Sequence, residues 1–303
     1  MRPRLELPLP RGYRSLEILA YHGRDPLSAS ERVDGSTIFK PVHLAGGPVR
    51  LAIGLGDAGV AVVRADRHLD AADDAQALRV AARMLGLSID PSAFEAALAA
   101  GSPLAQHVAL RPGLRIPLTA DPWEALCWAI IGQQINLVFA AALRRAMVEL
   151  AGRAHGDMRV HPRPAEVAAL SVEALAALRF SRAKAGYLVD AARHVASGAV
   201  DLDAIGALDA AGAEAALVAL RGIGPWTARY VMLRGFGMAD IAPIGDSGLA
   251  AGLQLLLGLS ERPDAVAQEA LMAAFRPHRS LVTAHLWAGL TSPRPSPSSA
   301  GPG

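Results

Sequence analysis

Residues 220–231 read Leu-Arg-Gly-Ile-Gly-Pro-Trp-Thr-Ala-Arg-Tyr-Val, and the fold is decided around this stretch. Apolar residues recur at helical spacing from Ala213 to Leu220, and two glycines then interrupt the pattern. Pro225 has the fixed φ that suits the first position of a new helix. The stretch therefore predicts a helix, a tight turn and a second helix.

The glycines of this turn, Gly222 and Gly224, let backbone N–H groups point outward at the start of the second helix. The partial positive charge there attracts an anion such as a phosphate. Glycines also occur in helix turns for packing reasons alone, which is the structural alternative. A lone carboxylate, Asp246, follows in Pro-Ile-Gly-Asp-Ser-Gly at 243–248. It is a candidate reactive group or the N-cap of a helix that begins at Ser247, and the two roles can coexist.

The chain has 303 residues, 52% hydrophobic and 19% charged, which is typical of a globular protein with two or more domains. No apolar run is long enough to cross a bilayer, and the first residues lack the apolar segment of a signal peptide. We therefore expect a cytoplasmic protein with no membrane partner. The single cysteine, Cys127, lies in an apolar run and argues against disulfides, cysteine zinc sites and cysteine-ligated iron–sulfur clusters.

The net charge of +2 is weak evidence for a nucleic-acid partner. Basic residues are nevertheless concentrated in the middle of the chain, where they form either a phosphate-facing surface or an ordinary solvated helix face. The candidates for a phosphate-facing surface are Arg144, Arg145, Arg179, Arg182 and Lys184.

Convincing strand patterns occur only near the N-terminus. Apolar or alternating runs at residues 36–44, 49–55 and 60–65 are separated by turn residues and predict an antiparallel meander. Helical patterns flank these runs on both sides. We expect an N-terminal α+β domain over residues 1–114.

From Asp121 onward the pattern is helical throughout. Asp121 is placed as the N-cap of the first helix, with proline at the first position and Glu124 able to reach back in a capping box. We expect helical domains over residues 115–291, with the helix-hairpin-helix at 213–234. The tail over 292–303 is rich in Pro, Ser and Gly, and a disordered tail is expected there.

The order of these features resembles the helix-hairpin-helix DNA glycosylase superfamily, and within it the DNA-3-methyladenine glycosylase II branch of alkylation repair. The segments that carry the resemblance, besides the hairpin and Asp246, are Arg-Pro-Gly-Leu-Arg-Ile-Pro at 111–117, Ala-Ile-Ile-Gly-Gln-Gln at 129–134, Pro-His-Arg-Ser-Leu at 277–281 and His-Leu-Trp at 285–287. The resemblance implies a mainly α protein with an N-terminal antiparallel sheet and two helical domains around an active cleft. It implies an enzyme that hydrolytically removes alkylated purines in base excision repair.

The chemistry of such a reaction suits Asp246. An N-alkylated purine carries positive charge and leaves readily, so the sugar becomes oxocarbenium-like as the glycosidic bond lengthens. A carboxylate beside the sugar can stabilise that charge and orient or deprotonate water. Bifunctional relatives place a nucleophilic lysine where this chain has Trp226, and both lysines of the chain lie far from Trp226 in sequence. A Schiff-base mechanism therefore lacks its nucleophile, and we expect a monofunctional enzyme.

A base inside a duplex must be flipped out and held by stacking. Trp226, Tyr230 and Trp287 are the predicted base pocket, because an electron-rich ring face attracts a cationic base. Four-residue spacing places the first two on one helical face, although core packing is the usual reason for such a pair. A related enzyme has a tyrosine where this chain has Ala288, which predicts a roomier pocket and leaves the preferred base open.

The resemblance also implies how DNA is held. Gln134 matches a wedge residue that fills the gap left by the flipped nucleotide, or else it satisfies the backbone at the helix break after Gly132. The other predicted DNA-contacting residues are Arg221, Gly222, Gly224 and Thr227. A monovalent cation, Na⁺ or K⁺, is implied at the backbone carbonyls of Val218, Leu220 and Ile223; no other cofactor is expected.

The expected partner is double-stranded DNA that contains alkylated bases, bound by a monomer. Two other functions compete with this hypothesis. The first is a non-catalytic helix-hairpin-helix DNA-binding protein, which would not need a carboxylate facing an aromatic pocket. The second is an oxidised-purine glycosylase with lyase activity, which Trp226 disfavours.

Overall fold

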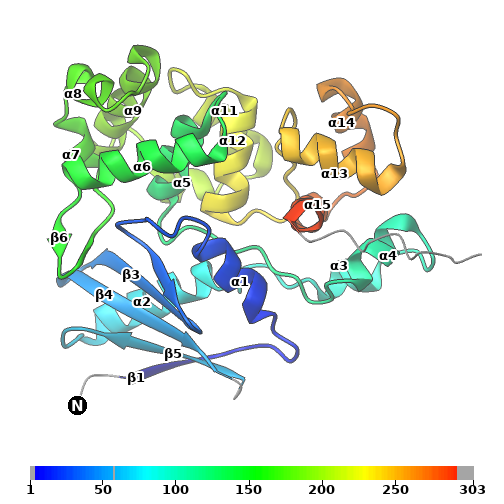
Figure 1. The fold of residues 1–303 in the computed structure, drawn as a ribbon, viewed down its shortest axis with the longest axis horizontal. Coiled ribbons are helices and arrows are strands. Elements are labelled where there is room, and N and C mark those ends of the chain that lie inside the picture. The colour runs from blue at the N-terminus through cyan, green and yellow to red at the C-terminus, as the bar shows by residue number, and fades with distance from the viewer. Residues whose placement is uncertain (1–3, 57–58, 292–303) are drawn as a thin grey trace, which may run out of the picture.

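The computed structural model describes residues 4–56 and 59–291. The predicted tail over 292–303 and most of the predicted turn at 57–59 lie outside the described residues. Figure 1 shows a sheet-containing part built from the N-terminal segment and a helical part beside it. This arrangement agrees with the mainly α fold and N-terminal antiparallel sheet expected from the sequence.

The sheet is antiparallel and five-stranded, with the strand order β1-β5-β4-β3-β2. Its strands are β1 (Arg4–Pro8), β2 (Arg32–Asp34), β3 (Thr37–Leu44), β4 (Gly47–Leu55) and β5 (Val60–Ala65). The meander formed by β3, β4 and β5 confirms the predicted strands, whereas the edge strands β1 and β2 carry several charged residues and were missed. Alternate residues of β4 are buried against α1 (Ser15–His22) and α2 (Ala71–Met84), as a one-sided sheet requires.

The remaining helices form the second part of the molecule. They are α3 (Ser92–Ala96), α4 (Pro103–Ala109), α5 (Pro122–Gly132), α6 (Leu137–Ala151), α7 (Pro164–Ala168), α8 (Val172–Ala177), α9 (Arg182–Ala196), α10 (Leu202–Gly206), α11 (Ala210–Val218), α12 (Pro225–Val231), α13 (Ser247–Leu257), α14 (Ala265–Ala273) and α15 (Arg279–Thr291). The expectation of helix throughout is wrong at one place, because a small hairpin of β6 (Ala154–His155) and β7 (Met158–Arg159) interrupts the helices.

Helix α5 lies at the centre of the helical core and contacts α6, α9, α10 and α12. Asp121 caps it as predicted, since its Oδ1 accepts the N–H of Trp123 at 2.7 Å. The predicted capping box is wrong, because Glu124 instead accepts a hydrogen bond from Lys40 at 2.7 Å. Lys40 is fully buried and also pairs with Glu31, so buried charges join the sheet to α5. Although burial opposes ionisation, the Lys40 ammonium holds the pKa of Glu124 below its usual value.

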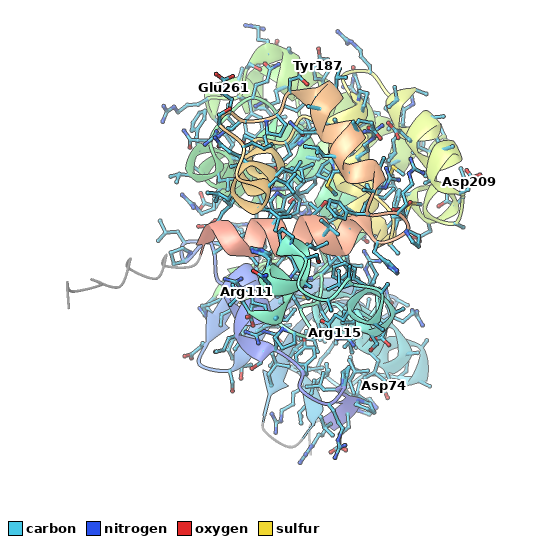
Figure 2. All side chains as sticks on the ribbon, turned by 90° about the vertical axis from the view of Figure 1, so that its right-hand side faces the viewer. Asp74, Arg111, Arg115, Tyr187, Asp209 and Glu261 are labelled. Atoms are coloured by element: carbon cyan, nitrogen blue, oxygen red, sulfur yellow. The ribbon has the colours of Figure 1, made fainter. Side chains whose placement is uncertain are left out.

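Helices α3 and α4 pack with the helical part, although residues 1–114 were expected to form one N-terminal domain. Their buried side chains, including Phe94 and Leu104, belong to the helical core, where α4 contacts α13 and α15. In the turned view of Figure 2, α15 lies between the sheet-containing part, where Asp74 is labelled, and the helices around Tyr187. No helix in the described ranges is both long and apolar enough to span a bilayer.

Candidate active site

Asp246 lies at the start of α13 and caps it, as the sequence allowed. Its Oδ1 accepts the N–H of Leu249 at 2.8 Å. The loop before it is held by Gln268, whose Oε1 accepts the N–H of Gly245 at 2.9 Å while its Nε2 donates to the Pro263 carbonyl at 2.9 Å. Gln268 is only 4% exposed and was missed, although a lone glutamine in the apolar run of α14 was a signal. These bonds fix the position of the carboxylate.

The Asp246 carboxylate also accepts hydrogen bonds from two indoles. Trp287 donates from Nε1 to Oδ1 at 2.9 Å, and Trp226 donates from Nε1 to Oδ2 at 3.3 Å. With the cap, these bonds occupy three of the roughly four acceptor positions that a carboxylate offers. The remaining capacity suits a water or a sugar hydroxyl. Asp246 is thus both a helix cap and a candidate reactive group.

The three aromatic residues of the predicted base pocket are brought together beside Asp246. The ring centroids of Trp226 and Tyr230 are 5.7 Å apart, and those of Tyr230 and Trp287 are 6.4 Å apart. All three side chains are half-buried rather than sealed in the core. Gly248 makes this approach possible, because a Cβ there would lie 3.0 Å from the Trp287 ring. The tight spacing explains the glycine of the Asp-Ser-Gly sequence.

Two arginines and a tyrosine that sequence reasoning missed complete this group. The guanidinium carbon of Arg234, in the π-helical turn η1 (Met232–Phe236) after α12, lies 4.5 Å from the Tyr21 ring centroid and 5.1 Å from that of Trp287. The guanidinium carbon of Arg24 lies 3.9 Å from the Tyr21 ring centroid. Burial raises the pKa of Tyr230 to about 12, and its phenol interacts electrostatically with both arginines and with Asp246. No short motif signalled these residues, because Tyr21 and Arg24 come from the N-terminal part.

The hairpin between α11 and α12 uses its two glycines differently. Gly222 has a φ of +79°, and a Cβ there would lie 2.2 Å from the Tyr187 ring, so only glycine fits. Gly224 has a φ of −90°, and a Cβ there would meet no protein atom within 4 Å. The first glycine is therefore required by packing, and the second leaves an open surface. Arg221 is exposed and donates to Asp190 at 3.1 Å.

The side chain of Thr227 is buried behind the hairpin. It is 3% exposed, and its Oγ1 accepts a hydrogen bond from Gln133 Nε2 at 3.0 Å. The same Nε2 donates to the Gly222 carbonyl at 2.9 Å, so Gln133 joins the end of α5 to the hairpin. The Thr227 hydroxyl is thus engaged inside the protein, and a DNA contact of Thr227 stays a prediction.

Gln134 projects from the surface beside this junction. It is exposed and has a φ of 55°, in the left-handed region that few non-glycine residues adopt. Lys184 supports the turn from behind, because its Nζ donates to the carbonyls of Ile131 at 2.9 Å and Gln133 at 2.8 Å. Two exposed apolar residues, Leu137 and Val138, lie just beyond this turn at the start of α6. This geometry agrees with a projecting residue at the helix break.

The predicted phosphate-facing surface is reduced in the structure. Arg144 pairs with Glu124, Arg145 pairs with Asp25, and Lys184 is engaged with carbonyls. These three side chains stabilise the fold rather than face a ligand. Arg179 and Arg182 are exposed.

The backbone carbonyls of the hairpin differ in whether they already accept a hydrogen bond. In the described residues, the carbonyls of Val218 and Ile223 accept no backbone hydrogen bond across the turn, whereas the Leu220 carbonyl accepts the Ile223 N–H at 3.1 Å. Each carbonyl retains at least one lone pair. Oxygen donors of this kind fit a hard monovalent cation, and the donor set does not oppose it.

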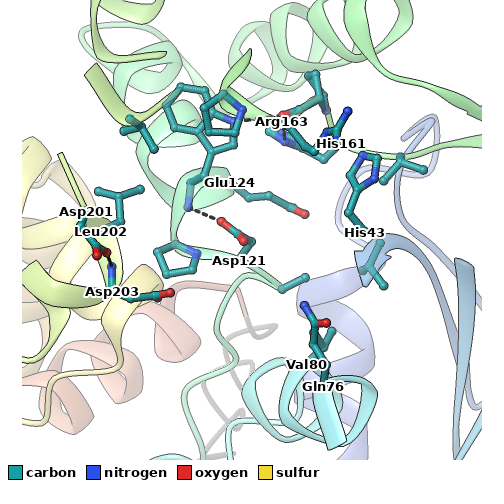
Figure 3. Close-up of a pocket in the computed structure, with 18 of the residues that line it drawn as sticks. His43, Gln76, Val80, Asp121, Glu124, His161, Arg163, Asp201, Leu202 and Asp203 are labelled. Carbon is teal, nitrogen blue, oxygen red and sulfur yellow. Dashed lines mark hydrogen bonds between the residues drawn. The ribbon is translucent and has the colours of Figure 1, made fainter. Parts of the chain in front are cut away.

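A separate hollow of about 410 Å³ lies between the sheet-containing and helical parts (Figure 3). His43, His161 and Asp121 line it, and none of the residues around Asp246 described above does. Burial lowers the pKa of His161 to about 3, so its imidazole is neutral. Asp121 is already committed to the cap of α5. The hollow is therefore distinct from the aromatic site.

Comparisons with known proteins agree with this geometry. Residues 127–277 match the family model described as HhH-GPD superfamily base excision DNA repair protein. The chain is 34% identical over 179 residues to DNA-3-methyladenine glycosylase of Bacillus subtilis strain 168, covering 58% of this chain and 59% of that protein. It is 31% identical over 170 residues to DNA-3-methyladenine glycosylase 2 of Escherichia coli strain K12, covering 55% of this chain and 57% of that protein.

The chain thus spans about three fifths of the length of these curated relatives. A solved 3-methyladenine DNA-glycosylase from Archaeoglobus fulgidus shares the fold, with a TM-score of 0.82 at 20% identity over 94% of this chain and 97% of that chain. The family-model match over residues 127–277 includes the hairpin, Asp246 and the second half of α5. The chain belongs to the HhH-GPD superfamily of base excision DNA repair proteins.

Proposed function

We propose that this chain is a monofunctional DNA glycosylase that flips alkylated purines of the 3-methyladenine type out of duplex DNA and hydrolyses their glycosidic bond. The observation that carries the proposal is the Asp246 carboxylate, oriented by two indole N–H groups beside three aromatic rings. The names of the curated relatives support the same activity. A helix cap alone would not need indole donors from α12 and α15.

In the proposed reaction the bond between C1′ and the purine nitrogen breaks, and its electron pair leaves with the base. The positive charge that develops on the sugar is stabilised by the Asp246 carboxylate in a half-buried site. A water oxygen then bonds to C1′, and its proton passes to Asp246 or to solvent. The products are the free base and an abasic site.

The flipped base would stack against Trp226, Tyr230 and Trp287, whose half-buried rings face one another around Asp246. The small side chain of Ala288, which follows Trp287, would leave room at this end of the pocket. This pocket would accept bulky purines rather than pyrimidines alone.

Duplex DNA is the proposed partner, bound by a monomer. The open surface at Gly224 would lie against the phosphate backbone, and Na⁺ or K⁺ at the carbonyls of Val218, Leu220 and Ile223 would contribute charge there. Gln134 would fill the gap left by the flipped nucleotide, because it is exposed on a turn held by Gln133 and Lys184. Arg221 would add a phosphate contact at the hairpin.

The absence of strand cleavage is part of the proposal. The chain has only two lysines, and each already has partners: Lys40 with Glu31 and Glu124, and Lys184 with the carbonyls behind Gln134. Neither is offered as a Schiff-base nucleophile. The protein should therefore leave abasic sites uncut without alkali, and borohydride should trap no covalent adduct with DNA.

The direct test is incubation of the protein with methylated duplex DNA, followed by identification of the released bases by chromatography. Release of alkylated purines, with uncut abasic sites, would support the proposal. Tight DNA binding without release of any base would favour the alternative of a non-catalytic binding protein. A borohydride-trapped adduct would contradict the monofunctional mechanism.

A further inference from the structure

We propose that Gln133 is a positioning residue that links the hairpin between α11 and α12 to the projecting Gln134. Through this link, binding of a DNA phosphate at the hairpin also aligns Gln134 with the gap that a flipped nucleotide leaves in the duplex. The inference rests on the proposed glycosylase function and deepens it. It assigns a role to a side chain that touches neither the base pocket nor Asp246.

The side-chain amide of Gln133 binds the hairpin at two points. Its Nε2 donates to the Gly222 carbonyl at 2.9 Å and to the Thr227 hydroxyl at 3.0 Å. These acceptors lie on either side of Gly224, the N-cap of α12, where a Cβ would meet no protein atom within 4 Å. An amide NH₂ group has two N–H donors, and both are used here. The amide therefore fixes the part of the hairpin that offers an open surface to a phosphate.

The backbone of Gln133 is held as well as its side chain. Its N–H donates to the Ile130 carbonyl at the end of α5, and its carbonyl accepts a hydrogen bond from Lys184 Nζ at 2.8 Å. The next residue, Gln134, is exposed and has a φ of 55°, a conformation that costs a non-glycine residue free energy. The direction in which Gln134 projects is therefore set by the residue that also binds the hairpin.

Helix α9 supports the two segments separately. Lys184 Nζ donates to the carbonyls of Ile131 at 2.9 Å and Gln133 at 2.8 Å, which holds the turn after α5. One turn further along α9, the Tyr187 ring packs against the hairpin so closely that a Cβ at Gly222 would lie 2.2 Å from it. Neither support uses the Gln133 side chain. Replacing that side chain should therefore leave both segments folded and remove only the direct link between them.

A fixed link matters because the two contacts act on different states of the DNA. Phosphate contacts place a protein on any duplex, whether or not a base pair is open. Extruding a nucleotide costs free energy, which a side chain that fills the gap partly offsets. A side chain whose position is set before DNA binds loses less conformational freedom when it enters the gap. The Gln133 link should therefore favour binding to opened duplex and leave binding to undamaged duplex unchanged.

The test measures the preference for opened DNA, which is the Kd for undamaged duplex divided by the Kd for the same duplex with an abasic-site analogue. Gln133→Met keeps the length of the side chain and removes both N–H donors. The preference should fall about tenfold, as expected for the loss of one or two hydrogen bonds, while the Kd for undamaged duplex stays within about twofold. Gln106→Met is the matched control, because Gln106 Nε2 also donates to a glycine carbonyl, that of Gly101, at 3.0 Å. This control should keep the wild-type preference.

Further variants separate positioning from a purely structural role. When Gln134→Ala is already present, Gln133→Met should lower the preference little further, because the side chain that it positions is gone. Thr227→Val removes the acceptor of the 3.0 Å bond and keeps the side-chain shape, so it should lower the preference in the same direction. Thr227→Ser keeps the hydroxyl and should keep the preference. Thermal unfolding checks that each variant is folded, and Thr227→Val carries the test if Gln133→Met does not fold.

Three outcomes would overturn the inference. They are an unchanged preference in folded Gln133→Met, an equal fall in Gln106→Met, and a fall that is as large with Gln134→Ala present as without it. The glycosylase function would still stand in each case if the wild-type protein releases bases from methylated duplex DNA. A wild-type protein that neither prefers the abasic-site analogue nor releases any base would overturn both.

Discussion

Replacing Asp246 with asparagine should separate the chemical role of this residue from its role as a helix cap. The Oδ1 atom accepts from Leu249 N at 2.8 Å and from Trp287 Nε1 at 2.9 Å, while Oδ2 accepts only from Trp226 Nε1 at 3.3 Å. An asparagine can keep its carbonyl at the Oδ1 position and place its NH₂ at the Oδ2 position. It then loses only the longest of the three bonds.

The two effects should differ greatly in size. Loss of one such hydrogen bond costs about 0.5–1.5 kcal/mol of folding free energy. Loss of the negative charge removes the group that balances the developing oxocarbenium ion, and comparable electrostatic groups contribute ~10²–10³ in rate, or about 2.7–4 kcal/mol. We therefore expect Asp246→Asn to fold, to bind DNA and to release bases at least ~100-fold more slowly.

Single-turnover release from methylated duplex DNA, thermal unfolding, and binding to a duplex with an abasic-site analogue measure these three properties. Asp264→Asn is the matched control, because Asp264 caps α14 with the same 2.8 Å bond to a backbone N–H. This control should keep both its helix cap and the wild-type rate, because asparagine caps a helix about as well as aspartate. The reasoning is refuted if Asp246→Asn releases bases within tenfold of the wild-type rate.

Three further predictions concern the hairpin, the projecting glutamine and the buried histidines. Gly222→Ala should destabilise the fold by more than the ~1–2 kcal/mol that a left-handed backbone costs a non-glycine residue, because the added Cβ meets the Tyr187 ring. Gly224→Ala should melt like the wild type and bind duplex DNA more weakly. Equal melting temperatures for the two variants would contradict this prediction. Gln134→Ala should weaken binding to an abasic-analogue duplex and slow excision at unchanged thermal stability, and a variant that melts early but excises normally would show a structural role instead. Burial lowers the pKa values of His161 and His285 to about 3 in the folded protein. The unfolded chain therefore binds more protons as the pH falls from about 6.5, and each histidine should cost ~1.4 kcal/mol of stability per pH unit, or about 2 kcal/mol at pH 5. Melting temperatures measured between pH 7.5 and 5 check this prediction, and His285→Leu should reduce the fall toward pH 5. A melting temperature that does not fall toward pH 5 would contradict it.

The sequence by itself determined the elements whose signals act over a few residues. Asp121 caps α5 and Asp246 caps α13, each through a bond to an N–H group two or three positions away. Pro225 begins α12. The alternating strands β3 to β5 followed from side-chain period alone. The same local reasoning found Trp226 and Tyr230 together, because residues four apart share a helical face.

Tertiary structure decided what each of these groups meets. Trp287 reaches Asp246 across 41 residues, and Gln268 holds the loop before it across 23 residues. Arg24 arrives from the N-terminal part to stand over a ring beside the pocket.

Glu124 shows the physical reason for this division. The capping-box pattern predicted that its carboxylate would accept a backbone N–H of its own helix. The carboxylate instead accepts a hydrogen bond from the fully buried Lys40, 84 residues away. A charge removed from water must be paired at almost any conformational cost, and a helix N-terminus can be satisfied by Asp121 alone. Local hydrogen bonds determine where helices begin, and the cost of removing charged groups from water determines which groups pair in the assembled core.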